Sequence, residues 1–172
     1  LKFIWAEGSY EAKQIAGKSL EKYGPKYPMI CLDFVALALP EIDNWSVCDC
    51  LAMYEVKPVV YANPELVLPL SEKWVQSTDK WVRRFGVVTL RGYKRLQATE
   101  KVFELLAMVM DDRERDVRKA IAWILREITK ANPEMVAEFL AKQAQTFRSK
   151  DKKYIIENGL KKLNDNEQRR II

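Results

Sequence analysis

Histidine is absent from this 172-residue sequence, and cysteine occurs only three times. Without histidine the chain has neither a Ser-His-Asp or Cys-His nucleophile system nor a histidine metal ligand. Cys31, Cys48 and Cys50 show no C-x-x-C spacing, which predicts reduced thiols rather than a disulfide framework. We therefore expect any catalysis to use carboxylates, aromatic rings and arginines, with no metal and no cofactor.

Glycine and proline are also scarce, at 6 and 7 residues, which argues against an all-β chain with many tight turns. No apolar run reaches the ~18 residues of a transmembrane helix, and no signal-peptide pattern is present. Phosphate-binding glycine motifs are missing as well, so we expect no nucleotide-phosphate cradle. These absences predict a cytoplasmic protein.

Hydrophobic residues make up 48% of the chain, enough to bury a sizeable core. Lysine plus arginine number 29 against 24 acids, so the net charge of +5 favours acidic partners mildly. No linker or low-complexity segment interrupts the sequence, and we expect residues 1–172 to form a single domain. The first residue is Leu1 rather than methionine, which indicates a piece of a longer protein.

Apolar residues recur at helical spacing along almost the whole chain, and period-two alternation is not sustained anywhere. Asn63-Pro64-Glu65 and Asn132-Pro133-Glu134 both resemble helix starts, with a cap, a proline and an acid in order. Pro58 and Pro69 predict a broken or kinked helix within 45–77. The predicted helices are 9–23, 28–39, 45–56, 64–77, 79–95, 98–110, 114–130, 133–147 and 151–164.

A faint repeat of about 35 residues links these helices. The two Asn-Pro-Glu triplets lie 69 residues apart, close to two such periods. Residues 81–85 align with 116–120 at an offset of 35, and the segment starting at Asp151 follows after another 35. Helix pairs at this spacing are typical of an α-solenoid, so we predict an all-α fold of HEAT-like repeats. An irregular helical bundle is the alternative.

The predicted helix 114–130 carries Trp123 on an unusual face. At 100° per residue, the apolar stripe contains Val117, Ile121, Ile124, Leu125 and Ile128. Trp123 lies opposite that stripe, between Lys119 and Arg126. The ring is either an aromatic surface in a basic groove or a packing contact with the next helix pair.

Trp45 and Asp49 are one helical turn apart and project from the same face. Asp49 is a functional carboxylate, a solvated acid or the partner of an arginine, and Trp45 is a functional ring or a cap on the core. Arg84 is either solvated or part of the same surface. In a solenoid, equivalent helices lie on the same side. The helices 45–56, 79–95 and 114–130 would therefore present Trp45 and Asp49, Arg84, and Lys119, Trp123 and Arg126 on one concave surface.

Such a set suits nucleic acid. Cations neutralise phosphates, tryptophans stack on bases or on cations, and a carboxylate stabilises positive charge that develops on a sugar during glycosidic bond cleavage. None of these tasks needs histidine or a metal.

Three motifs resemble the DNA alkylation repair family of HEAT-like DNA glycosylases, the AlkD type, in both order and separation. They are Asn44-Trp45-x-Val47-x-Asp49, Trp81-Val82-Arg83-Arg84, and Val117-Arg118-Lys119-Ala120-Ile121-x-Trp123-x-Leu125-Arg126-Glu127. The resemblance covers most of the chain and is strongest over 44–130. It implies a right-handed superhelix of helical repeats.

Members of that family remove cationic N3- and N7-alkylated purines from DNA. By resemblance, Asp49 is the catalytic carboxylate, and Trp45 and Trp123 flank the deoxyribose. Arg84 and Arg126 hold the phosphate backbone in that comparison. Arg118 and Lys119 are further candidates for DNA binding. The resemblance thus implies a monofunctional alkylpurine glycosylase that acts on double-stranded DNA without a cofactor.

Two departures from the family pattern stand out. Ser46 replaces the acid that usually follows the first tryptophan, and Cys48 and Cys50 give that helix an unusual composition. We also expect the chain to lack the additional N-terminal helices of family members. A non-catalytic HEAT-like module that binds DNA structure or a protein is therefore the alternative function. The absence of an apolar seam predicts a monomer.

Overall fold

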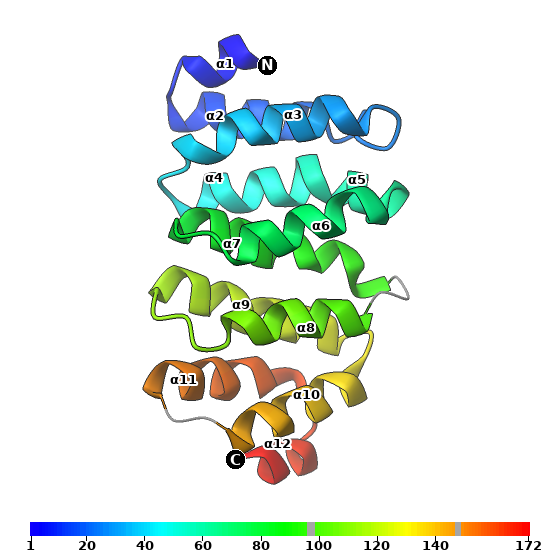
Figure 1. The fold of residues 1–172 in the computed structure, drawn as a ribbon, viewed down its shortest axis with the longest axis vertical. Coiled ribbons are helices and arrows are strands. Elements are labelled where there is room, and N and C mark those ends of the chain that lie inside the picture. The colour runs from blue at the N-terminus through cyan, green and yellow to red at the C-terminus, as the bar shows by residue number, and fades with distance from the viewer. Residues whose placement is uncertain (96–98, 147–148) are drawn as a thin grey trace. The chain divides into compact units, whose positions relative to one another are not determined.

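The computed structural model describes residues 1–95, 99–146 and 149–172, and all regular structure in these ranges is helical (Figure 1). The all-α prediction is confirmed. The chain divides into two compact units, Leu1–Tyr93 and Lys94–Ile172, and each is described by itself. Within the described ranges no helix is both long and apolar enough to cross a membrane.

Residues up to Val75 contain α1 (Lys2–Ala6), α2 (Tyr10–Ser19), α3 (Pro28–Ala38), α4 (Trp45–Cys50), the π-helical segment η2 (Leu51–Val56), α5 (Lys57–Ala62) and α6 (Pro64–Val75). They are followed by α7 (Lys80–Thr89), α8 (Thr99–Val109), α9 (Arg115–Thr129), α10 (Pro133–Gln145), α11 (Lys150–Gly159) and α12 (Asp165–Ile171). Short 3-10 segments end α3, α7 and α11, at Leu39–Glu41, Leu90–Arg95 and Leu160–Lys162.

The helix starts follow the 35-residue period. The second helix of each pair begins 35 residues after the one before it, at Tyr10, Trp45, Lys80, Arg115 and Lys150. A side-chain oxygen caps most of these starts, from Ser9, Asn44, Asp79 and Ser149. Side-chain caps satisfy backbone N–H groups that lack an intrahelical partner, so each cap fixes its helix start. The period detected in the sequence is therefore also a period of helix boundaries.

Each predicted helix corresponds to an observed one, with ends that differ by a few residues. Two predicted boundaries, at residues 98 and 147, lie outside the described residues. The short helices α1 and α12 were not predicted, because five and seven residues are too few to show a clear apolar period.

The break predicted within 45–77 lies at Asn63, between α5 and α6, and not at Pro58. At Pro58 the helix continues, and it runs from Trp45 to Ala62 through the π-helical turn of η2. Proline lacks the N–H and crowds the carbonyl four residues earlier, and a wider turn directly before Pro58 accommodates both effects. Pro69 likewise lies inside α6 without ending it.

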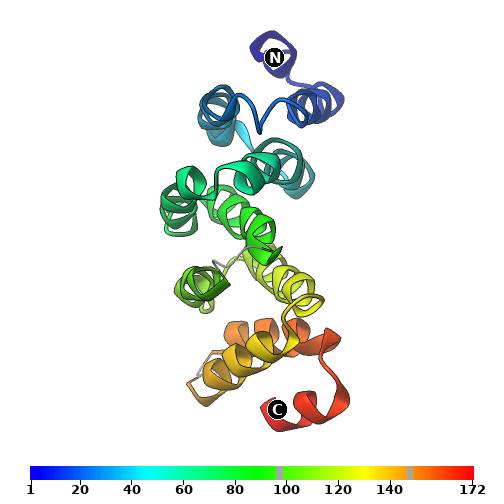
Figure 2. The same ribbon diagram turned by 90° about the vertical axis from the view of Figure 1, so that its right-hand side faces the viewer.

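In the first unit, α4 contacts both α2 and α7, so these three helices lie side by side. α3 and α6 form a second row, with Met29 and Trp74 lining the hollow between them. Figure 2 shows the helices of this unit nearly end-on, in two rows. α6 and α7 approach closely at Gly86, where a Cβ atom would lie 2.8 Å from the Val75 backbone nitrogen. Glycine is therefore required at position 86.

In the second unit, α9 packs against α10 and α11, and α10 packs against α12. The apolar stripe predicted on α9 is confirmed, since all five of its residues are fully buried: Val117, Ile121, Ile124, Leu125 and Ile128. Phe103 of α8 and Phe139 of α10 pack with ring centroids 4.9 Å apart. α9, α10 and α11 therefore share a core, and α8 packs on α10 through this ring pair.

Glu55, in the π-helical segment, is fully buried. Neither of its carboxylate oxygens has a hydrogen-bond partner among the described residues. Burial is the main cause that raises the pKa of Glu55 to about 7. The Leu20 backbone N–H and the Cys31 thiol lie near enough to oppose part of this rise, although neither completes a hydrogen bond.

We predict that Glu55→Gln removes a pH-dependent loss of stability. Between about pH 4.5 and 7 the folded chain keeps this proton and the unfolded chain releases it, so the free energy of unfolding falls by on the order of 3 kcal/mol in total as pH rises through that window. Urea unfolding at several pH values should show this decline in the wild type and not in Glu55→Gln. No histidine titrates in this window, and the contribution of Asp49, whose pKa burial also raises, is common to the wild type and Glu55→Gln. The control is Glu65→Gln, at an exposed position, and an unchanged decline in Glu55→Gln would contradict the prediction.

Candidate functional site

The start of α4 positions Trp45 and Asp49. The Asn44 side chain accepts a hydrogen bond from the Val47 N–H at 3.0 Å and thereby fixes the first turn. Trp45 is the first helical residue, and 58% of it is exposed, so the ring does not cap the core. Asp49 follows one turn later on the same face, with 17% of its side chain exposed.

Arg84, from the next helix of the same row, pairs with Asp49. The Asp79 carboxylate caps α7 by accepting from the Trp81 and Val82 N–H groups, which makes Arg84 the fifth helical residue, as Asp49 is in α4. Arg84 Nε donates to Asp49 Oδ1 at 2.9 Å, and Nη2 donates to Oδ2 at 2.7 Å. Among the alternatives for Asp49, the structure therefore shows the partner of an arginine, in bidentate geometry.

Burial and the guanidinium act on Asp49 in opposite directions. Burial is the larger cause and raises the pKa of Asp49, whereas the hydrogen bonds and charge of Arg84 lower it. Only 7% of the Arg84 side chain is exposed, so little water screens the pair. A carboxylate that is largely removed from water and lies one turn from an exposed tryptophan can stabilise a cation strongly.

The residues that departed from the family pattern hold α4 in place. The hydroxyl groups of Ser46 and Tyr10 share a hydrogen bond of 2.7 Å, which joins α4 to α2. The buried Cys48 thiol donates to the Trp81 carbonyl at 3.5 Å, and Cys50 donates to the Gln14 carbonyl at 3.7 Å. Burial raises the pKa of Cys50 to about 11. Both thiols are buried and donate to backbone carbonyls, so they serve as packing groups.

The second unit carries the remaining candidates on α9. Lys119 is exposed and, like Asp49 and Arg84, is the fifth residue of its helix. Trp123 is half-buried, one turn further along α9. Arg126 is also half-buried, and its Nη1 donates to the Asn158 carbonyl at 2.8 Å.

Arg118 has partners within its own unit. Its guanidinium forms an ion pair with Asp151 and lies 5.3 Å from the centre of the Tyr154 ring. The sequence analysis did not single out Tyr154, although it follows Lys119 by 35 residues and so takes the equivalent position in α11. The structure thus joins Asp49 to Arg84 in the first unit, and Arg118 to Asp151 and Tyr154 in the second.

Comparison with known proteins gives a family and a fold. A family model described as DNA alkylation repair enzyme matches residues 1–163. Among solved structures, smu.31 from Streptococcus mutans is similar, with a TM-score of 0.70 and 20% sequence identity, over 95% of this chain and 85% of that chain. At this identity the likeness establishes the fold alone. No curated protein matches the sequence.

We predict that removing the Arg84 guanidinium raises the pKa of Asp49 further, because only the opposing effect of burial then remains. Arg84→Gln should show the full rise, and Arg84→Lys, which keeps the charge but loses the bidentate geometry, a smaller one. Carboxyl carbon NMR titration measures both. Arg83→Gln is the control, since Arg83 donates instead to the Ser77 and Thr78 carbonyls. An Asp49 titration that is the same in Arg84→Gln and Arg83→Gln would refute the assigned cause.

Proposed function

Because the chain belongs to the DNA alkylation repair enzyme family, we propose that it is a DNA glycosylase that hydrolyses the bond between deoxyribose and a cationic N3- or N7-alkylated purine. The observation that carries the proposal is the bidentate Asp49–Arg84 pair beside the exposed ring of Trp45. These residues take the positions at which the family motifs predict the catalytic carboxylate, a phosphate contact and a ring against the sugar.

The proposed reaction starts from a base that already carries a positive charge. The C1′–N bond breaks, its electron pair neutralises the departing purine, and positive charge develops on the sugar. The Asp49 carboxylate stabilises that charge, and Arg84 holds both carboxylate oxygens in a fixed orientation. Water then adds its oxygen to C1′, and its proton passes to Asp49 or to solvent. Trp45 and Trp123 flank the sugar through their ring faces.

Register along the chain supports a common role for residues of successive helices. Asp49, Arg84 and Lys119 are each the fifth residue of a helix, 35 residues apart. We propose that these helices belong to one right-handed solenoid of HEAT-like repeats, with Lys119, Arg126 and Arg118 contacting phosphates of double-stranded DNA. Arg118 would do so while paired with Asp151. The reaction needs no cofactor and no lysine nucleophile, so strand cleavage is not expected.

We predict that Asp49→Asn abolishes release of 7-methylguanine from methylated duplex DNA, because the amide carries no charge to stabilise the sugar cation. Affinity for the same duplex should stay similar or rise slightly, since one negative charge near the phosphates is lost. Released base is measured by chromatography, and affinity by fluorescence anisotropy. Asp33→Asn, an exposed aspartate on α3, is the control and should keep full activity. Equal release by Asp49→Asn and wild type would rule out the proposed role.

The non-catalytic module has a specific observation in its favour. Asp49–Arg84 and Arg118–Asp151 each join neighbouring helices of one row, as a purely structural ion pair would. No base release by the wild type, together with intact DNA binding, would select this alternative over the glycosylase.

Salt dependence separates DNA binding from a protein scaffold. If Lys119 contacts one phosphate, Lys119→Gln should reduce the slope of log affinity against log salt by about 1 and weaken binding to all sequences alike. Anisotropy titrations at several salt concentrations measure the slope. Lys73→Gln, an exposed lysine on α6, is the charge-matched control. A slope near zero for the wild type would refute phosphate contacts altogether.

A further inference from the structure

A groove lies between α8 and α10 in the second unit, lined by none of the α9 residues given a role above. Its volume is about 420 Å³, which is within the range of sites that bind ligands or anchoring side chains. Its floor is made of Phe103, Ala107, Met135 and Phe139, and Glu100 and Glu138 line its edges. We call this feature the acidic groove.

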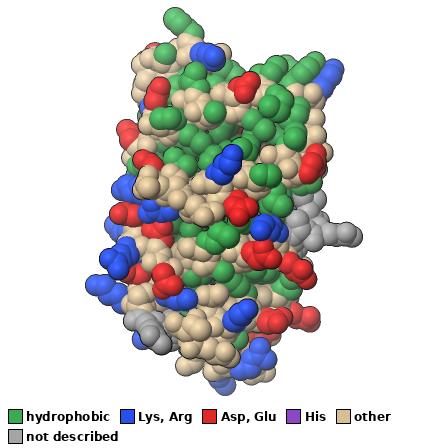
Figure 3. Space-filling model, in the orientation of Figure 1, with side chains coloured by type: hydrophobic (Ala, Val, Ile, Leu, Met, Phe, Trp, Pro, Cys, Tyr) green, Lys and Arg blue, Asp and Glu red, His purple; other side chains and the backbone are tan. Residues whose placement is uncertain are grey.

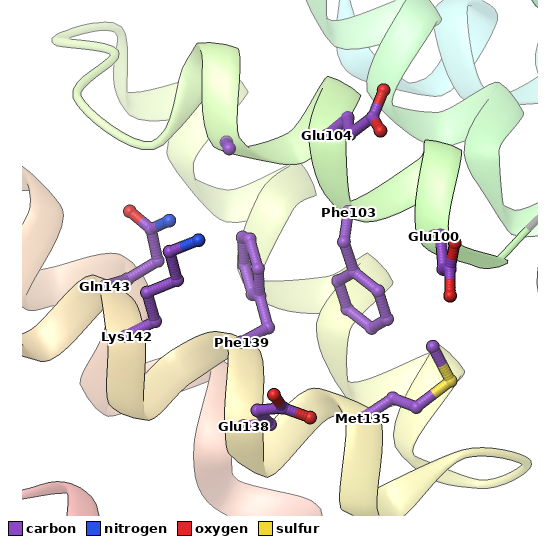
Figure 4. A pocket seen from close by; sticks show the side chains of 9 residues that line it. Glu100, Phe103, Glu104, Met135, Glu138, Phe139, Lys142 and Gln143 are labelled. Carbon is purple, nitrogen blue, oxygen red and sulfur yellow. The ribbon is translucent and has the colours of Figure 1, made fainter.

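The floor is apolar and well packed. Phe103 points from α8 toward α10, and Phe139 points from α10 toward α8 (Figure 4). The two rings lie 4.9 Å apart and leave only 8% and 9% of these residues exposed, so their positions are fixed by mutual packing. Met135 lies beside them, and its flexible thioether can adapt to an incoming apolar side chain. Ala107 occupies little of the space between the helices.

The edges carry negative charge. Glu100 and Glu138 are exposed, and neither forms an ion pair among the described residues. Glu104, which also lines the groove, binds Lys101 Nζ at 2.9 Å, and Lys142 is the cation among the lining residues. Three acids against one lysine give the lining a charge of −2, in a chain whose net charge is +5. Figure 3 shows acidic side chains gathered over α8 and α10.

The apolar floor and the acidic edges together indicate which kind of molecule the acidic groove would bind. Negative edges repel DNA phosphates, so the acidic groove is not an extension of a DNA-binding surface. An apolar floor between two helices fits the apolar face of a third helix, and acidic edges fit lysine or arginine beside that face. We propose that the acidic groove docks a basic amphipathic helix of a partner protein. Leucine or methionine side chains would rest on Phe103 and Phe139, and cations would pair with Glu100 and Glu138.

The test uses a fluorescein-labelled helical peptide with leucine at i, i+3, i+4 and i+7 and lysine elsewhere, titrated with the full chain by anisotropy. Reversing both edge charges, in Glu100→Lys/Glu138→Lys, should weaken binding on the order of tenfold, because two attractions become repulsions. The matched control is Glu134→Lys, which reverses an exposed acid of α10 that does not line the groove. A peptide with glutamate in place of lysine should not bind.

A label reports where the peptide binds. All three native cysteines are buried, so Ala107→Cys offers an exposed thiol for an environment-sensitive dye on the groove floor. Its emission should shift when the lysine peptide is added. Binding without such a shift, equal binding of the glutamate peptide, or an unchanged affinity of the double variant would each overturn the proposal.

Two further measurements distinguish docking of a partner protein from self-association of the chain and from the proposed glycosylase function. Sedimentation that shows a dimer, dissociated by Glu138→Lys, would identify a second copy as the occupant and overturn the partner proposal. DNA affinity and base release should be the same in the double variant and in Glu134→Lys. If the proposed glycosylase function is wrong, the wild type will release no base, but the peptide titration will give the same result.

Discussion

The ion pair between Asp49 and Arg84 depends on the 35-residue repeat of the chain and lies at the centre of its candidate site. Two charges that are largely withdrawn from water are stable only while each has the other, and a displaced partner would leave a costly buried charge. The residues are 35 apart, which equals the distance between the starts of α4 and α7. The pair therefore forms only when the two helices are in register, and Ser46 and Cys48 support that register through contacts of α4 with α2 and α7.

Pairing also determines what Arg84 contributes. The family resemblance assigns this arginine to the phosphate backbone, and under the proposed function its geometry adds a positioning role, because Nε and Nη2 both hold the carboxylate. An aspartate without a fixed partner can adopt several rotamers, and a bidentate guanidinium restricts Asp49 to one. Preorganisation of this kind is most useful when the leaving group is already activated, as in a cationic purine. The remaining barrier is then largely the electrostatic cost of the sugar cation.

Local periodicity was sufficient to predict the helices and their 35-residue spacing, since caps and apolar stripes are properties of neighbouring residues. The alternatives that the sequence leaves for Asp49 include an arginine partner, but the choice of Arg84 depends on packing between helices, which no local pattern records. The partners of Arg118 likewise depend on packing between helices and could not be predicted from local sequence. Arg118 was expected to contact DNA, and the structure adds Asp151 and Tyr154 as partners from the following repeat. Glu55 could not be foreseen either, because a glutamate in a helix is normally solvated and the π-helical turn is set by tertiary context.

Asp49 and Glu55 together show how one continuous helix treats two carboxylates differently. Both lie on the run from Trp45 to Ala62, and burial raises the pKa of each. Asp49 has a guanidinium to offset burial, whereas Glu55 has no partner among the described residues and reaches a pKa of about 7. In a chain without histidine, Glu55 is thus a group that titrates near neutrality, while Arg84 favours the charged form of Asp49. The guanidinium therefore does more than join two helices: it preserves the negative charge on which the proposed cleavage depends.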